Sequence, residues 1–310
     1  MIEYFKMALT KNISPRHLLL LGCTVFAGPI HAEIPDIDWF NDGDISLGHN
    51  DNFSQAHLDR DKIADNFIDV SYSLVASMDL TDSDAIAVKG FLEHRQQDVI
   101  EDLSRSTFGL QFIYRWQYSL GYFQPFFQFN TSIQQDKFGT EQRDSTGVKS
   151  QLIMTNRLTD AIMLVSGIEY WQQDAEDNVF DLYHHRIFAS VDYNTKSNST
   201  YYGAYSFSKG EIWSSGQAVF CNGANAVDIF PIIAASLERS PDKAFNNALC
   251  SDEWLAYKVE ADTHTLKLGY NTALWDSSAL DISVLKILSK ADDNIDYESL
   301  IYNISYLVRF

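Results

Sequence analysis

Long apolar runs are scarce in this sequence of 310 residues. Past residue 32, no stretch approaches the roughly 18 consecutive apolar residues that a membrane-spanning helix needs. The longest apolar segments, such as 161–165 and 229–235, are far shorter. A spanning helix is therefore excluded for that part of the chain. A crossing by strands is not excluded, because a strand presents only every second side chain to lipid.

Basic residues are also few relative to acidic ones. The chain has 23 Lys and Arg against 42 Asp and Glu, and its formal net charge is −19. Nucleic acid is a polyanion that proteins bind through clustered Lys and Arg. The charge balance therefore argues against a nucleic-acid partner.

Cysteine occurs only three times. One of the three, Cys23, lies in residues 1–32, which have the features of a secretory signal peptide. Basic residues are followed there by the apolar segment 18–30, and Ala32 supplies a small residue at the cleavage point. An alternative is a lipoprotein signal, because residues 20–23 resemble a lipobox, although the apolar run before it is very short. We predict ordinary cleavage after Ala32 and export of the chain.

Removal of that signal leaves one pair of cysteines, Cys221 and Cys250. An even number of cysteines in an exported chain favours a disulfide. Neither residue belongs to a C-x-x-C motif or has a histidine nearby, so a redox or metal site is not indicated. We predict that Cys221 and Cys250 form a disulfide that closes a loop.

Catalytic and cofactor motifs are also lacking. The sequence has no Gly-x-Ser-x-Gly, Walker or zinc-protease motif. His184 and His185 lie near Asp181, but adjacent residues of a strand face opposite sides, so we interpret them as structural. We predict no metal site, no cofactor and no catalytic residues.

Aromatic residues, in contrast, are abundant: 20 Phe, 16 Tyr and 6 Trp make up 14% of the chain. Many of them recur with a period of two, most clearly in 108–118. One set of alternate positions in that segment is apolar or aromatic: Phe108, Leu110, Phe112, Tyr114, Trp116 and Tyr118. A helix would scatter these side chains around its axis. The pattern predicts strands with one face in an apolar medium.

The last stretch, 300–310, shows the same alternation and ends on an aromatic residue. Its apolar face is Leu300, Tyr302, Ile304, Tyr306, Val308 and Phe310. The stretch resembles the closing strand of bacterial outer-membrane β-barrels, which typically ends in Phe. The resemblance implies an all-β fold: a transmembrane, antiparallel, up-and-down β-barrel in the outer membrane of a Gram-negative bacterium. It also implies that Phe310 belongs to an assembly signal read by the barrel-assembly machinery, and that the other partners are outer-membrane lipid and lipopolysaccharide.

The spacing of the alternating segments fits that expectation. Short connections near 79–84, 119–121, 158–160, 194–200 and 273–278 alternate with longer or charged ones near 55–65, 99–104, 136–147, 174–178, 214–254 and 291–297. With a first strand at 45–54 there are about twelve strands, and bacterial barrels have even strand numbers, short periplasmic turns and longer outer loops. We expect one barrel domain over 33–310, with 33–44 as a lead-in and both termini in the periplasm. A soluble β-sandwich or lipocalin-like barrel also alternates, but it would turn its apolar face inward.

If the apolar faces meet lipid, the polar faces line the lumen. The predicted lumen-lining residues are Lys89, Glu93, Arg95, Arg115, Gln117, Lys149, Arg157, Glu169, Arg186 and Lys267. Both signs of charge occur, whereas a purely basic lining would indicate acidic sugars as solutes. Two interpretations stay open: an internal network of ion pairs and amides, or the lining of a selective pore.

Three functions are compatible with the sequence. The leading prediction is a passive, porin-like channel for small polar solutes, because the lumen face is polar and porins often fold a long loop like 214–254 inward. The second is a non-conducting barrel whose outer loops bind a ligand, surface polymer or partner, because that loop is large and acidic. The least favoured is a hydrolase similar to outer-membrane phospholipase, which needs His and Ser two positions apart. No such pair occurs at His94, His184 or His264, and we therefore do not predict an enzyme.

Overall fold

The computed structural model describes residues 37–119, 121–249, 253–291 and 295–310. All of the described residues belong to the second of two units of the chain, Asp36–Phe310. The predicted signal peptide lies outside the described residues, as does Cys250, so the predictions made for them stay predictions.

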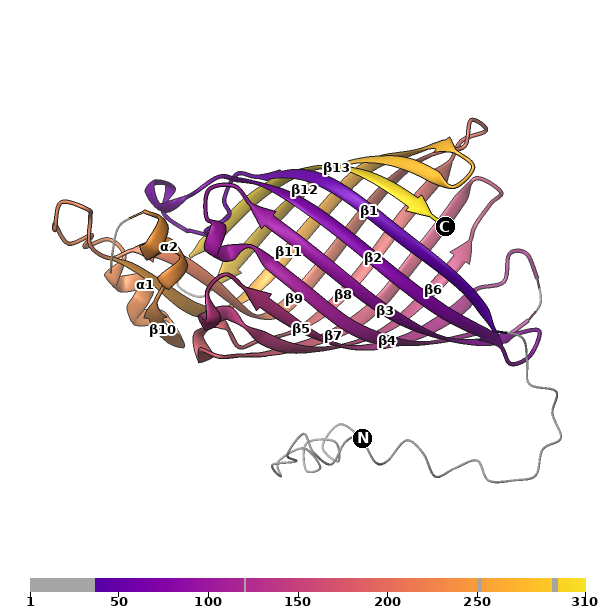
Figure 1. The fold of residues 1–310 in the computed structure, drawn as a ribbon, viewed down its shortest axis with the longest axis horizontal. Helices are drawn as coiled ribbons and strands as arrows, with labels where there is room; N and C mark the ends of the chain where they lie inside the picture. The colour runs from indigo at the N-terminus through magenta and orange to yellow at the C-terminus, as the bar shows by residue number, and fades with distance from the viewer. Residues whose placement is uncertain (1–36, 120, 250–252, 292–294) are drawn as a thin grey trace, which may run out of the picture. The chain divides into compact units, whose positions relative to one another are not determined.

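The second unit is an antiparallel β-barrel (Figure 1). Over the described ranges, twelve strands close the ring in sequence order, and β1 pairs with β13 to complete it. The barrel strands are β1 (Asp38–Asn50), β2 (Asp65–Asp79), β3 (Asp84–Gln97), β4 (Arg105–Gln117), β5 (Phe126–Phe138), β6 (Ser145–Arg157), β7 (Ile162–Ala175), β8 (Leu182–Asn194), β9 (Ser199–Gln217), β11 (Trp254–Trp275), β12 (Ser278–Ala291) and β13 (Asp296–Arg309). The predicted fold class and strand number are confirmed.

The apolar side chains lie on the outer surface of the barrel. In β4, Phe108, Leu110 and Phe112 are 44%, 60% and 41% exposed. Ile133 on β5, the register partner of Leu110, is 54% exposed. A soluble barrel would bury this face, whereas a barrel in a membrane solvates it with lipid. The direction of the alternation therefore excludes the lipocalin-like alternative.

The first strand begins earlier than the predicted 45–54. β1 covers Asp38–Asn50 and pairs with β2 on one side and β13 on the other. The sequence pattern was obscured because acidic residues occupy the lumen face of this strand. Arg309 Nε donates to Oδ1 of Asp42 at 2.7 Å, and Asp44 accepts a hydrogen bond from a serine of β2. Part of the predicted acidic lead-in is therefore barrel wall.

β9 and β11 are the longest of these strands and extend beyond the rim. Their mutual pairing continues to Gln217 and Trp254, whereas β8 leaves β9 at Gly210 and β12 leaves β11 at Ala261. The two strands therefore form a two-stranded extension where their other neighbours have ended.

The connection predicted at 214–254 is shorter than expected and is not a plain loop. It spans 218–253 and contains α1 (Phe230–Ala235), β10 (Glu238–Pro241) and α2 (Lys243–Ala248). β10 pairs with residues 255–258 of β11, beyond Ala261, where the pairing of β11 with β12 ends. Among the described residues, no helix is long and apolar enough to cross a membrane.

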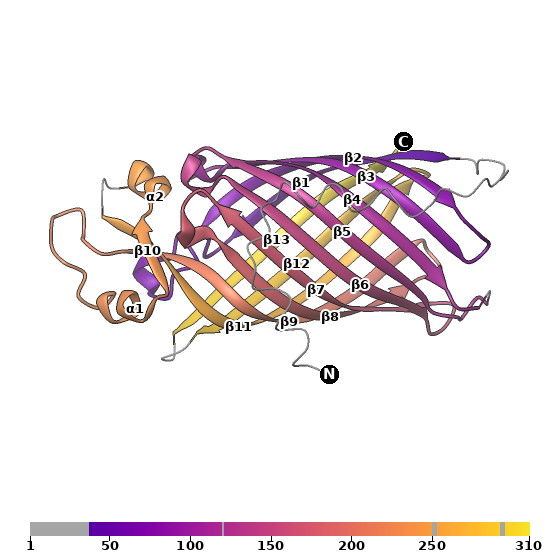
Figure 2. The same ribbon diagram turned by 90° about the horizontal axis from the view of Figure 1, so that it is seen from below.

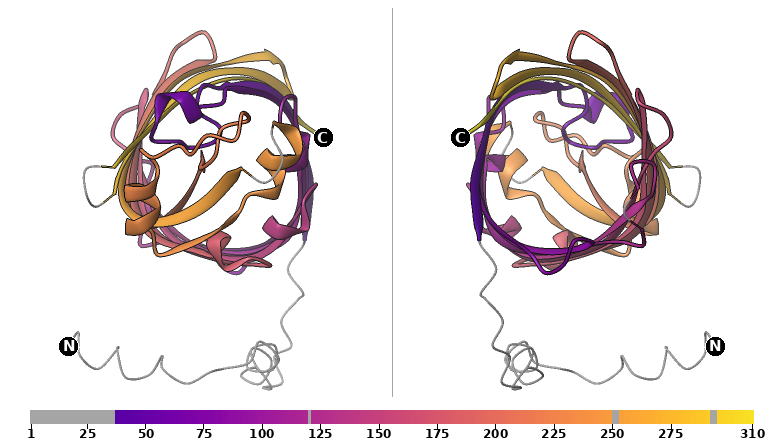
Figure 3. Two further views of the ribbon diagram at one scale, coloured as in Figure 1. Left: turned by 90° about the vertical axis from the view of Figure 1, so that its left-hand side faces the viewer. Right: turned by 90° about the vertical axis from the view of Figure 1, so that its right-hand side faces the viewer.

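This connection and the strand extension cover one end of the barrel. The side and end views show its segments, coloured orange, beyond the rim and across the opening (Figures 2 and 3). We call residues 211–249 and 253–260 the lid. The five short turns lie at the opposite end of the barrel.

The buried apolar side chains gather at the lid. Within the described part of the chain they form three clusters, each of which joins lid residues to other connections of the same rim. The first contains Ala218, Ala226, Ile229, Ile232, Ile233, Tyr257, Val259, Ile295 and Tyr297; the second contains Ile100, Leu103, Ala244, Phe245 and Trp254; the third contains Val179, Phe180 and Ala256. The packed core of this molecule is therefore at one mouth of the barrel.

Candidate channel lumen and lid

The strand register places all ten residues that the sequence assigns to the lumen on the inner face. Lys89 on β3 is the partner of Gln111 on β4, and Glu169 on β7 is the partner of Arg186 on β8. The positions between them carry the exposed apolar residues of the outer face, such as Val88 and Leu92. The ten residues come from β3, β4, β6, β7, β8 and β11.

Glu169 is the centre of a fixed network in the wall. Arg186 Nη2 donates to Glu169 Oε2 at 2.7 Å, and Gln151 Nε2 donates to the same oxygen at 2.6 Å. His184 Nε2 lies 3.5 Å from Oε1. Only 4% of the Glu169 side chain is exposed. This carboxylate therefore holds neighbouring strands together and does not face a passing solute.

Other predicted residues keep an uncompensated charge in the lumen. Lys89, Glu93 and Arg115 form no hydrogen bond or ion pair with any residue that the structure describes, and their side chains are partly or fully exposed. A charge in this position needs water around it. The middle of the barrel is therefore hydrated and carries both signs of charge.

Aromatic rings on the lumen face pack onto glycines of the neighbouring strand. A Cβ atom on Gly147 would lie 2.5 Å from the Trp171 ring, and a Cβ on Gly269 would lie 2.2 Å from the Tyr202 ring. The same relation joins Gly48 to Phe67, Gly109 to Phe91 and Gly167 to Phe188. A side chain at any of these glycines would push its ring toward the lumen, so the glycines keep the interior open.

Several of these rings also hold a cation from the predicted set. The distances from the cation to the ring centroid are 4.2 Å for Arg95 over Phe67, 5.1 Å for Lys149 over Trp171, 5.4 Å for Arg186 over Phe188 and 5.5 Å for Lys267 over Tyr202. Such contacts stabilise a cation by about 0.5–2 kcal/mol. The lumen cations are thus held near the wall.

A buried ion pair fixes the lid to the rim. Arg143, in the connection between β5 and β6, donates from Nη2 to Oδ2 of Asp242 in the lid at 2.7 Å, and the side chains are 4% and 0% exposed. The Arg143 guanidinium also lies 4.0 Å from the Phe180 ring centroid and 4.2 Å from that of Trp213. Ser215 donates a hydrogen bond to the same carboxylate. The rim contributes Arg143 and Phe180, and the lid contributes the other three groups.

Further polar contacts join the lid to its neighbours around the rim. They are Ser215 N to Ser54 O at 3.0 Å, Arg60 Nη2 to Asp228 Oδ1 at 2.8 Å, Asn247 Nδ2 to Asp102 Oδ2 at 2.7 Å, Gln142 Nε2 to Pro241 O at 2.8 Å and Lys258 Nζ to Asn178 O at 2.9 Å. Four connections of the same rim are engaged in this way.

Apolar burial contributes more to lid closure than these polar contacts do. Ile229, Phe180 and Phe245 are at most 2% exposed. Fully burying one such side chain contributes about 1.5–3 kcal/mol, and three clusters of buried residues act together in the described part of the chain. The lid is therefore a packed part of the barrel and not a freely moving flap.

Beneath the lid lies a cavity of about 330 Å³, which we call the chamber. Its apolar lining consists of Phe53, Leu103, Phe138, Phe180, Leu182, Trp213, Ile287, Tyr297 and Ile301. Three guanidinium groups also reach it, from Arg95, Arg105 and Arg143. Of the residues predicted to line the lumen, only Arg95 contributes to the chamber.

The opposite mouth opens into a cavity of about 810 Å³, which we call the vestibule. It is lined by residues 79–85 and by Arg115, Gln117 and Phe126. Gln117 Nε2 donates to the carbonyl oxygen of Gly121 at 3.2 Å and so supports the turn after β4. Two of the predicted lumen residues therefore lie at this mouth.

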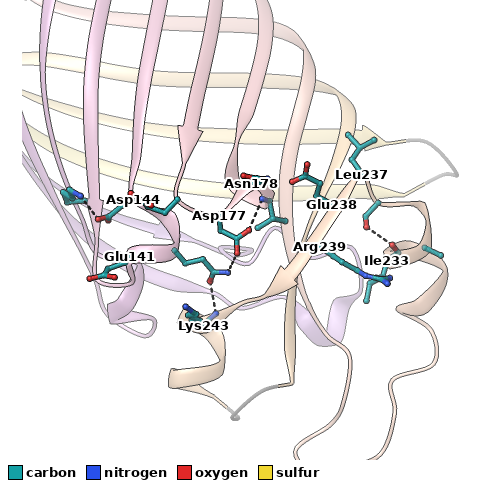
Figure 4. Close-up of a pocket in the computed structure, with 15 residues that line it drawn as sticks. Glu141, Asp144, Asp177, Asn178, Ile233, Leu237, Glu238, Arg239 and Lys243 are labelled. Carbon is teal, nitrogen blue, oxygen red and sulfur yellow. Dashed lines mark hydrogen bonds and ion pairs between the residues drawn. The ribbon is translucent and has the colours of Figure 1, made fainter. Parts of the chain in front are cut away.

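On the side of the lid that faces away from the barrel, a polar cleft of about 1220 Å³ separates it from two connections of the same rim (Figure 4). Asp177 bridges the two sides: Gln142 Nε2 donates to its Oδ2 at 2.8 Å, and Ser240 Oγ donates at 2.5 Å. Burial would raise the pKa of Asp177, but the hydrogen bonds from Gln142, Ser240 and Val179 outweigh it and hold the pKa below its ordinary value. The charged residues around the cleft have both signs: Glu141, Asp144, Glu176 and Glu238 against Lys137, Arg239 and Lys243.

The two adjacent histidines face opposite sides of β8. His184 approaches Glu169 in the lumen, whereas His185 packs against Tyr170 with ring centroids 5.1 Å apart. Among the residues that the structure describes, no group of three or more His, Cys, Asp or Glu could hold a metal ion.

Comparison with solved structures identifies the fold. The COG4313 outer membrane channel from Pseudomonas putida F1 is 11% identical to this chain, with a TM-score of 0.52 over 92% of this chain and 100% of that one. This chain has the fold of a bacterial outer-membrane β-barrel. Two porins are more distant. The KdgM porin in complex with disordered oligogalacturonate is 9% identical, with a TM-score of 0.41 over 87% of this chain and 99% of that one. The NanC porin is 11% identical, with a TM-score of 0.37 over 86% of this chain and 98% of that one. No protein-family model matches the chain, and a search of curated proteins finds no match.

Sequence analysis of this outer-membrane barrel missed several residues of the site. Arg105 lies between the predicted connection near 99–104 and the predicted strand 108–118, but it is in phase with the polar face of that strand, and that phase could have found it. Arg143 and Asp242 lie in separate connections, and no local signal pairs them. Asp69, which accepts two hydrogen bonds from Arg95, is not among the ten predicted lumen-lining residues.

Proposed function

We propose that this outer-membrane barrel is a passive channel for small polar solutes, whose outer mouth is narrowed by the lid. The observation that carries the proposal is the hydrated lumen: uncompensated charges of both signs line the interior between the chamber and the vestibule. A barrel that served only as an anchor would gain more stability by pairing those charges or replacing them with apolar packing.

The lengths of the connections support an orientation in the membrane. In bacterial barrels the short turns face the periplasm and the longer connections face outward. The lid then faces the exterior, and the vestibule with Arg115 and Gln117 faces the periplasm. Both ends of the barrel domain would lie on the periplasmic side.

The lid limits the size of solute that can enter. It makes contacts around the rim and encloses a chamber of about 330 Å³, which is at the small end of ligand-binding cavities. Small solutes therefore pass more readily than oligomers. Mixed charges in the lumen disfavour solutes that carry several charges of one sign.

Swelling of proteoliposomes tests this function. We expect vesicles that contain the barrel to swell in an isotonic pentose solution and to swell far less in a trisaccharide solution. Protein-free vesicles and vesicles with heat-unfolded protein are the controls. Absence of swelling with the pentose would contradict the proposal.

The outer cleft favours a second function, in which the barrel does not conduct and instead binds a polar ligand from the exterior. Its volume and its charges of both signs suit a surface polysaccharide or the sugar headgroup of lipopolysaccharide. The test is binding of immobilised lipopolysaccharide by the wild type and by a variant with Arg239→Gln and Lys243→Gln. Binding that the variant loses, together with absent swelling, would favour this second function.

A further inference from the structure

Two arginines face each other in the wall of the chamber. Arg95 on β3 and Arg105 on β4 are direct register partners, and both line the chamber. Like charges directly opposite each other on one face of a sheet repel. Arg95 is compensated, because its Nε and Nη2 donate to the two carboxylate oxygens of Asp69 at 2.6 and 2.7 Å.

Arg105 is not compensated in the same way. Its ion pair with Asp136 is long, with 3.8 Å between Nε and Oδ1, and its guanidinium makes no hydrogen bond to any of the described residues. Asp136 is engaged elsewhere: Thr107 donates to its Oδ1, and Gln134 Nε2 donates to its Oδ2 at 3.1 Å. A third of the Arg105 side chain, 33%, remains exposed. Its donors are therefore available to a ligand in the chamber.

A buried amide side chain lies beside this donor. Gln97, on β3 next to the pair of arginines, lines the chamber and is 2% exposed. Its Oε1 is buried and has no hydrogen-bond partner in the part of the chain that the structure describes. That oxygen has almost no accessible surface, so Gln97 contributes to the chamber as a fixed part of its wall and does not offer this oxygen to a ligand.

The remainder of the chamber is suited to an apolar body. Nine of the other lining side chains are aliphatic or aromatic, and they come from both the barrel wall and the lid, among them Phe138, Leu182 and Trp213. The rest are polar and include one carboxylate, Glu298, to which Lys286 Nζ donates at 2.7 Å. The volume of about 330 Å³ accommodates one small molecule and excludes an oligosaccharide. Ligand pockets commonly combine such walls with a few fixed polar groups.

We infer that the chamber binds small amphipathic monocarboxylates, with the carboxylate on Arg105 and an apolar or aromatic body against the apolar part of the wall. This inference narrows the solute class of the proposed function and depends on it only for the route by which the ligand reaches the chamber. Binding itself requires no conduction.

Fluorescence of Trp213, which lines the chamber, reports occupancy directly. The probe is 4-hydroxybenzoate, and 4-hydroxybenzamide is the neutral analogue of the same shape. Both are titrated into the purified barrel in detergent micelles, and the signal of a Trp213→Phe variant is subtracted. We expect saturable quenching by the carboxylate. The amide should bind at least about tenfold more weakly, because a hydrogen bond to a charged group contributes about 1.5–3 kcal/mol.

Arginine variants decide whether Arg105 is responsible. Arg105→Gln should weaken carboxylate binding about tenfold or more, whereas Arg105→Lys should retain part of it. Arg115→Gln removes a guanidinium at the other mouth and should leave binding unchanged. Heat-modifiable migration on gels verifies that each variant is folded.

Two results would overturn the inference: equal binding of the carboxylate and the amide, or unchanged carboxylate binding in Arg105→Gln. Swelling separates this inference from the proposed function. Pentose-driven swelling without carboxylate binding contradicts only the chamber site. Carboxylate binding that depends on Arg105, in a barrel that does not swell vesicles, supports the chamber site and contradicts only the channel.

Discussion

Arg143 and Asp242 are 99 residues apart in the sequence, yet their side chains meet at 2.7 Å in a contact that is almost fully buried. The pair joins a connection of the rim to the lid at the start of α2. Removing one partner of a buried pair leaves the other charge desolvated and uncompensated. This contact is therefore the most sensitive polar point in lid closure.

We expect Asp242→Asn to destabilise lid closure by about 3–5 kcal/mol, the usual effect of breaking a buried ion pair. Faster deuterium exchange in lid peptides of the variant, with unchanged exchange in the barrel strands, would show it. The matched control is Lys137→Gln, which breaks the more exposed ion pair with Asp144. It should change the free energy of lid opening, as measured by exchange, by only about 0–1 kcal/mol. Equal exchange in both variants and the wild type would mean that the pair contributes nothing to closure.

The lid should be more tightly closed in acid than at neutral pH because of Asp61. This residue is 1% exposed and lies against Gly216 of the lid, and burial raises its pKa to about 6 despite the nearby Arg60. A carboxyl group whose pKa is raised on closure stabilises the closed state when it is protonated. The contribution is complete below about pH 4, the ordinary range of the pKa, and is lost as the pH rises through about 6.

Deuterium exchange of lid peptides at about pH 5 and about pH 7.5, corrected for intrinsic rates, measures this dependence. Asp61→Asn keeps the side chain neutral at both values and should abolish the difference. A pH effect that persists in Asp61→Asn would assign it to another group.

The two faces of β5 should differ sharply in their tolerance of charge. Ile133 is 54% exposed on the outer face near the middle of the strand, whereas its neighbour Gln134 faces the lumen and donates to Asp136. Ile133→Arg should destabilise the folded barrel by about 2–4 kcal/mol in a lipid-vesicle unfolding titration. Gln134→Arg should have a much smaller effect because the lumen is hydrated. Equal effects would contradict the assignment of the faces.

Cys221 and Cys250 should be bonded to each other. An exported chain meets an oxidising compartment, which favours disulfide formation. In the chain-entropy model, a disulfide that closes a loop of about 30 residues stabilises the folded loop by roughly 3–4 kcal/mol. Thiol labelling of the unreduced, denatured mature protein should detect no free thiol. Two labelled thiols per chain would remove this link from the lid.

Much of the barrel could be predicted from the sequence because each strand contacts lipid on only one face. Lipid demands apolar side chains at every second position, and 108–118 and 300–310 show this pattern plainly. β1 was misplaced because its lumen face carries Asp42 and Asp44, which gave the segment the composition of a loop. The average composition of a segment does not show whether apolar and polar side chains alternate along it, whereas the side chains at every second position do.

The lid and the chamber could not be predicted in the same way. Their contacts join residues from different connections, such as Arg143 and Asp242. They also depend on how far β9 and β11 extend beyond the ends of the neighbouring strands. The glycine–aromatic pairs, such as Gly147 with Trp171, require the register between strands. No local pattern carries that information.

Single-channel recording in planar bilayers tests the central claim most directly. Gln217 and Trp254 are register partners at the end of the β9–β11 ladder, so an Asn-Gly turn can replace 218–253 and close the hairpin. We expect a small conductance for the wild type and a several-fold larger one for the shortened variant, because the lumen remains hydrated when the part of the lid between β9 and β11 is removed. Equal conductance would show that the lid does not narrow the mouth, and absence of conductance in both proteins would contradict the channel itself.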